Sequence, residues 1–78
     1  MAKSKTFPEI WQSLDIDRRR DLKAAILATT RVSEVAFYTW ANGERRPKMY
    51  PVIMGVTEAT NRTLGTNYTY AQLFPINS

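Results

Sequence analysis

The amino-acid sequence predicts an all-α fold of four to five short helices in one small domain. Signals that start and end helices recur along the chain, whereas patterns typical of strands are few. The 78 residues suffice for one domain, and they contain no internal repeat, low-complexity segment or linker. A domain of this size buries a small core, so we expect a modest stability of its own or support from a partner subunit.

The first helix is expected to begin after Thr6 and to end near Leu14. Thr6 can cap the helix, and Glu9 stands three residues after Thr6, as in a capping box. Pro8 is tolerated in the first turn of a helix. An apolar face is supplied by Ile10, Trp11 and Leu14.

A second helix is predicted from Asp15 or Asp17 to about Ala28. Either carboxylate can cap a helix and places a negative charge at its positive end. Helical spacing relates Leu22, Ala25, Ile26 and Thr29, and the opposite face carries Arg20 and Lys23. The β-branched and polar segment 29–31 predicts a turn.

A third helix is predicted between Ser33 and Gly43. Ser33 is a good N-cap, and Gly43 can take the left-handed conformation that follows a helix end. One face carries Ala36, Phe37 and Trp40, of which we expect the two aromatic side chains in the core. The other face presents mainly small and polar side chains: Ser33, Glu34, Val35, Tyr38, Thr39 and Asn42.

Two further helices are predicted in the C-terminal part. Pro47 and Pro51 bracket a loop and the start of a fourth helix, whose apolar residues repeat at helical spacing until Gly65. Thr69 with Gln72 three residues later resembles a capping box that opens a single turn at 70–73.

The positive charge is concentrated in the middle of the chain. The formal net charge is +4, and residues 18–48 contain eight Lys or Arg against three Asp or Glu. The segments on either side contribute no net positive charge. This distribution suggests an anionic partner for the middle segment.

The residue types present argue against catalysis and metal binding. The chain has no cysteine and no histidine, so it lacks the usual nucleophilic thiol, the usual general base and the commonest metal ligands. We interpret the carboxylates of Asp15 and Asp17 as helix caps, and we expect no enzyme activity and no cofactor. Because no signal peptide or membrane span is recognisable, we expect a cytoplasmic protein.

These elements resemble the helix-turn-helix of the Cro/lambda-repressor family over roughly residues 18–75. Val32-Ser33 matches the turn, Phe37 the buried position of the second helix, and Trp40 the end of that helix. Residues 42–47 look like the family's x-G-x-x-x-P loop, and residues 70–75 resemble its closing short helix. The resemblance implies a lambda-repressor-like fold and a small repressor-like regulator of transcription that binds specific double-stranded DNA.

The general principles of DNA recognition predict a role for each of these residues in such a DNA-binding domain. A helix in the major groove presents its first residues to base edges, so we expect contacts from Ser33, Glu34, Val35, Tyr38, Thr39 and Asn42. Phosphate contacts are expected from Arg18, Arg19, Arg20, Lys23, Arg31, Arg45, Arg46 and Lys48. Since phosphate contacts would dominate the affinity of one module, specificity is expected to require a homodimer on a two-fold site.

Several of these residues have a second interpretation. Tyr38 could pack against the protein instead of entering a DNA groove. Glu34 could act only as a negative charge that stabilises the N-terminal end of its helix. Arg18, Arg19 and Arg20 could form a solvated face paired with Asp15 or Asp17. The chain as a whole could also be a protein–protein interaction module that docks through residues 49–51 and the apolar fourth helix, or a DNA-binding accessory factor of a phage or mobile element.

Overall fold

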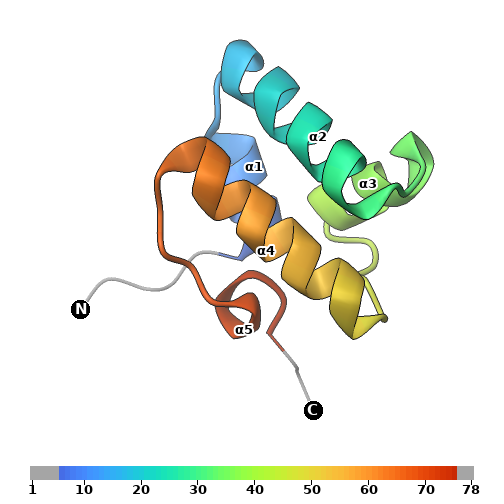
Figure 1. Ribbon diagram of the computed structural model, residues 1–78. Helices are drawn as coiled ribbons and strands as arrows, with labels where there is room; N and C mark the ends of the chain where they lie inside the picture. Colours follow the sequence, from blue (N-terminus) through green and yellow to red (C-terminus); the bar gives the residue numbers. More distant parts are fainter. Residues whose placement is uncertain (1–5, 76–78) are drawn as a thin grey trace.

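The computed structural model describes residues 6–75, and in this range the chain is helical without a strand. The helices are α1 (Phe7–Ser13), α2 (Ile16–Thr30), α3 (Glu34–Ala41), α4 (Tyr50–Leu64) and α5 (Tyr70–Leu73) (Figure 1). The prediction of an all-α fold with four to five short helices is therefore confirmed.

Four helices begin at the caps that the sequence indicates. The Thr6 backbone N–H donates to Glu9 Oε1 at 2.9 Å, which forms part of a capping box. Of the two candidate caps of α2, Asp15 is the one used, because its carboxylate accepts from the Arg18 N–H at 2.8 Å. The remaining two caps accept from the N–H three residues onward: Ser33 at α3 and Thr69 at α5.

The second helix is longer than predicted, because it continues through Thr30 instead of ending near Ala28. Arg31 adopts the left-handed conformation, with φ of 58°, and its N–H donates to the Leu27 carbonyl at 2.8 Å. The Thr30 hydroxyl donates a hydrogen bond to the Ile26 carbonyl at 2.7 Å. The prediction that Thr29 and Thr30 lie in a turn is therefore wrong, and the connection to α3 consists of residues 31–33.

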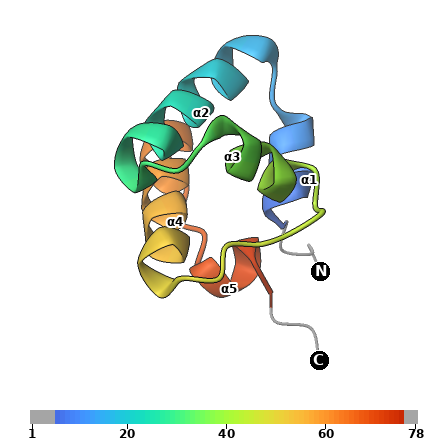
Figure 2. The ribbon, with the colours of Figure 1, turned by 90° about the vertical axis from the view of Figure 1, so that its right-hand side faces the viewer.

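The core lies between two pairs of helices. In Figure 2, α2 and α4 lie on one side and α1 and α3 on the other, and the contacts between elements show the same pairing. Phe37 is fully buried, and its ring lies 4.9 Å from the Trp11 ring and 6.1 Å from the Phe7 ring. Trp40 is also buried, with 7% of its surface exposed. The prediction that Phe37 and Trp40 belong to the core is confirmed.

The packing of these helices leaves α3 at one side of the molecule (Figure 1). Its buried aromatic residues anchor it, while its opposite face is turned away from the core. Within residues 6–75 no helix combines the length and the apolar character that crossing a membrane would require.

Candidate nucleic-acid interface

The α3 helix lies on the side of the molecule that faces the viewer in Figure 2, and most side chains of its outer face are exposed. Val35 is 75% exposed, so its side chain is free to contact a partner. The other side chains of this face are exposed as well, apart from the half-buried Thr39: Ser33, Glu34, Tyr38 and Asn42. The six side chains assigned to base contacts thus share one accessible face, although Tyr38 is only 39% exposed.

The loop after α3 is tied to the end of this helix. The Thr39 carbonyl accepts from the backbone N–H groups of Glu44, at 2.9 Å, and Arg45, at 3.2 Å. Gly43 makes the tight bend possible because it takes a positive φ of 79°, as its role after the helix end predicts. Pro47 is buried and fixes the far end of the loop.

A groove joins the loop to the outer face of α3. Its volume is about 620 Å³, and its lining combines residues of the helix with cationic residues of the loop: Ser33, Val35, Ala36, Thr39, Trp40, Arg45, Arg46, Pro47 and Lys48. The structure therefore brings together several predicted base readers and three predicted phosphate contacts. Part of the hydrogen-bonding capacity of Arg46 is used within the protein, since one guanidinium nitrogen donates to the Pro75 carbonyl at 3.1 Å.

Arg31, Arg45 and Lys48 are exposed and form no ion pair within residues 6–75. Arg31 lies in the connection that precedes α3, whereas Arg45 and Lys48 follow its C-terminal end. Cations whose charge is not neutralised by a neighbouring carboxylate are the ones best suited to an external anion. These three side chains flank α3 at both of its ends.

Lys23 connects α2 to the outer face of α3. Its ammonium donates to the Tyr38 hydroxyl at 3.3 Å and lies 3.6 Å from Glu34 Oε1. It also lies 5.3 Å from the centre of the Tyr38 ring. The hydrogen bond with Tyr38 raises the pKa of the Lys23 ammonium, and the charge of Glu34 adds to this effect. The Tyr38 ring packs on Trp11 and Phe37, as the second interpretation of this residue expects, whereas contact of its exposed edge with DNA stays a prediction.

Arg19 has a different role from a surface cation, because it ties α2 to α1. Its Nε donates to the Trp11 carbonyl at 3.0 Å, and an Nη donates to the Gln12 carbonyl at 3.1 Å. Its guanidinium carbon lies 5.4 Å from the centre of the Trp11 ring. The guanidinium of Arg19 is therefore used to join α2 to α1.

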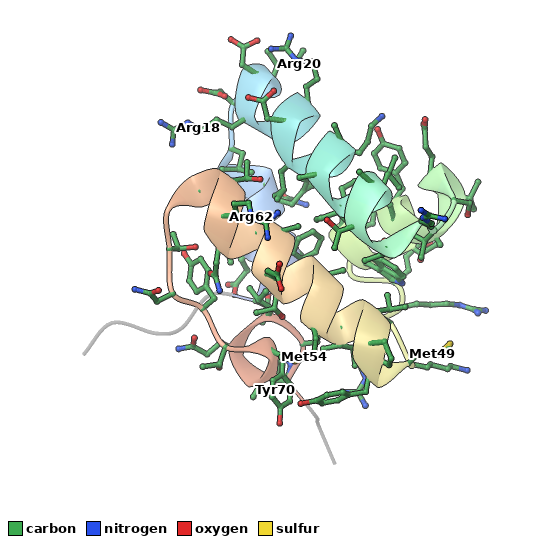
Figure 3. All side chains as sticks on the ribbon, in the orientation of Figure 1. Arg18, Arg20, Met49, Met54, Arg62 and Tyr70 are labelled. Atoms are coloured by element: carbon green, nitrogen blue, oxygen red, sulfur yellow. The ribbon has the colours of Figure 1, made fainter. Side chains whose placement is uncertain are left out.

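The neighbouring arginines lie at the N-terminal end of α2, apart from the loop cations. Arg20 pairs with Asp17 at 3.6 Å and with Asp21 at 3.7 Å, in agreement with the second interpretation of this cluster. In Figure 3, Arg18 extends from α2 on the side away from α3. The structure therefore does not gather Arg18, Arg19 and Arg20 with the groove beside α3.

A second surface feature lies at the start of α4 and on α5. Four large apolar side chains are exposed there: Met49, Tyr50, Met54 and Tyr70. The rings of Tyr50 and Tyr70 pack edge to face with centres 5.6 Å apart. Figure 3 shows Met49, Met54 and Tyr70 at the same end of the molecule. The sequence indicated Met49 and Tyr50, but not that α5 would bring Tyr70 beside Tyr50.

The described residues do not place three or more acidic side chains where they could share a metal ion. No protein-family model, curated protein or solved structure matches the chain.

Proposed function

We propose that the protein binds double-stranded DNA as a small transcriptional regulator of the repressor type, with α3 in the major groove. The observation that carries this proposal is the groove in which the exposed face of α3 meets the cations of the following loop. Base edges are read by side chains on a helix, whereas Lys and Arg beside it neutralise phosphates. One continuous surface of this chain offers both kinds of group.

The dimensions of α3 suit this role. An α-helix with its side chains is about 10–12 Å across, which fits a major groove about 12 Å wide. The connection of three residues between α2 and α3 is of the length used in helix-turn-helix units. In this arrangement Glu34 accepts from a cytosine amino group and Val35 contacts a thymine methyl group, because both lie in the first turn.

The proposed DNA complex contains a homodimer. One small module gains most of its affinity from phosphates, which carry no base identity, so two modules are needed for a useful preference. The chain measures 32 × 26 × 20 Å, and half-sites one helical turn apart are separated by about 34–36 Å. Two copies side by side on one face of the duplex are therefore compatible with adjacent major grooves.

Selection of bound duplexes from a random DNA pool tests this proposal. We expect enrichment of one motif, with two related half-sites about 10 base pairs apart. A pool that shows no enrichment after repeated selection, at salt concentrations low enough for binding, would contradict sequence-specific recognition. An enriched motif without two-fold symmetry would contradict the homodimer alone.

A protein–protein interaction module is the second candidate function. The exposed side chains of Met49, Tyr50, Met54 and Tyr70 favour it, because clustered apolar groups on a small domain often mark a contact surface. Salt separates the two functions, since binding through this surface would change little between low and moderate ionic strength. Replacement of Met49 and Met54 by Ser would weaken such a contact and leave the DNA affinity of a single module unchanged.

A further inference from the structure

We infer that Lys23 is a positioning residue for base recognition, holding Glu34 and Tyr38 in place on α3. This inference rests on the proposed function, and it differs from the role in phosphate contact that the sequence suggested for Lys23. Glu34 and Tyr38 are four residues apart and therefore lie one above the other on the same helix face. Lys23 reaches both from α2 with a single ammonium group.

The geometry around Tyr38 limits its movement. The ring packs edge to face on Phe37, with centres 5.3 Å apart, and on Trp11 at 6.4 Å. The Lys23 ammonium lies near the ring and donates to its hydroxyl oxygen. The position of the Tyr38 hydroxyl is thus set by contacts from α1, α2 and α3 together.

The ammonium also changes what Glu34 presents to DNA. A carboxylate in the first turn of a groove helix approaches two rows of phosphates, and their charges repel it. Lys23 offsets this negative charge and directs one carboxylate oxygen, which leaves the other as an acceptor of defined position. Because a hydrogen bond to Tyr38 and an ion pair with Glu34 hold the Lys23 ammonium on the protein, it contributes to the choice of base instead of neutralising a phosphate.

Replacement of Lys23 by Met tests this assignment, because Met keeps an unbranched apolar stem and removes the charge. On the selected site and its single-base variants, Lys23→Met should reduce discrimination roughly three- to thirtyfold at the base pair read by Glu34, a part of what a whole base contact supplies. The slope of log K against log salt should stay unchanged. Lys23→Arg should restore most of the discrimination, since a guanidinium can pair with Glu34 and stack on Tyr38.

Two matched variants complete the design. Arg45→Ala removes a loop cation without an ion pair, and it should reduce the salt slope by about 1 while the base preference is kept. In the background of Glu34→Gln, Lys23→Met should add little further loss of discrimination, because its effect acts through that carboxylate. If Lys23→Met instead lowers the salt slope by about 1 and keeps the base preference, Lys23 contacts a phosphate and the inference is wrong.

The contact itself can be measured by NMR without DNA. Nuclear Overhauser effects should connect the ε-methylene protons of Lys23 with the ring protons of Tyr38, because the ammonium donates to the hydroxyl of that ring. The absence of these effects in the folded chain would overturn the inference whatever the DNA experiments give. A wild-type chain that selects no DNA would overturn the proposed function and this role with it, whereas a motif that Lys23→Met leaves unchanged would overturn this role alone.

Discussion

Gly55 of α4 lies so close to Thr30 of α2 that a Cβ atom on Gly55 would stand 2.9 Å from the Thr30 Cγ2 methyl group. The C-terminal end of α2 packs against α4 at this point, and this close contact is possible because Gly55 has no side chain. The Thr30 hydroxyl is bonded to the Ile26 carbonyl, so the methyl group cannot rotate away without breaking that hydrogen bond.

The first prediction is that Gly55→Ala destabilises the fold despite the better helix propensity of Ala. Overpacking costs about 1–3 kcal/mol, and the propensity gain returns only about 1 kcal/mol. Thr30→Ser removes the obstructing methyl group and keeps the hydroxyl. In that background Gly55→Ala should become neutral or stabilising. Urea denaturation of the four chains measures this change of sign, and equal effects in both backgrounds would show that the methyl contact is not limiting.

The second prediction concerns Trp40, which is 7% exposed and belongs to the core. Trp40→Ala should lower the free energy of unfolding by about 3–5 kcal/mol, as the loss of a large buried aromatic side chain does. This is a large share of the roughly 4–12 kcal/mol expected for a domain of this length. Chemical denaturation is the measurement. A variant that keeps its stability and loses only DNA affinity would mean that Trp40 is a DNA contact.

The third prediction separates Arg19 from Arg18. Arg19→Ala should cost about 1–2 kcal/mol of stability, because it removes two charged hydrogen bonds to α1 and the contact with the Trp11 ring. Arg18→Ala is the matched control, since Arg18 is an exposed neighbour without an ion pair among the described residues. Thermal unfolding of both variants should show the loss only for Arg19. If Arg19→Ala instead reduces the salt slope of DNA binding and leaves the stability unchanged, Arg19 contacts a phosphate and the prediction is wrong.

The helix starts could be predicted from the sequence because capping is local. Thr6, Asp15, Ser33 and Thr69 each accept from, or pair with, groups only three residues away. The end of α2 could not be predicted in the same way. It depends on Arg31 adopting a left-handed conformation, which is uncommon for residues other than Gly, Asn and Asp.

The roles of the cations were harder to predict than their positions in the chain. The sequence shows Arg19, Arg20 and Lys23 as neighbouring charges on one helix, without showing what each one faces. Arg19 donates to the Trp11 carbonyl of α1, 8 residues away in the sequence. Lys23 donates to the Tyr38 hydroxyl of α3, 15 residues away. Such partners follow from helix packing and not from local spacing. Arg45 and Lys48 lie in a loop whose place beside α3 followed from Gly43, so their location was predictable.

The fourth prediction is that the affinity for DNA depends strongly on salt. If each bound chain neutralises about four phosphates with the cations that flank α3, log K per chain should fall against log salt with a slope of about −4. Fluorescence anisotropy on the selected duplex, over a series of salt concentrations, measures this slope. An unrelated duplex of equal length is the control and should give weaker binding with a similar slope. Affinity that does not respond to salt would exclude nucleic acid as the partner.

The fifth prediction distinguishes residues that position the protein from residues that read bases. Arg45 lies beyond the C-terminal glycine of α3, whereas Glu34 and Val35 occupy the first turn of this helix. Arg45→Ala should therefore weaken binding to specific and scrambled duplexes about equally, because a phosphate contact carries no base identity. Glu34→Ala or Val35→Ala should change the discrimination at one base pair by about 1–3 kcal/mol.

Titrations of each variant with the specific and the scrambled duplex, at one fixed salt concentration, give both quantities. Val35→Ala is the cleaner of the two reading variants, because the Val35 side chain is 75% exposed and its truncation removes little packing. Glu34→Ala also frees Lys23, so its effect includes the loss of that ion pair. If Arg45→Ala alters the base preference while Val35→Ala and Glu34→Ala leave it intact, the loop after α3 enters the groove and α3 itself lies outside it.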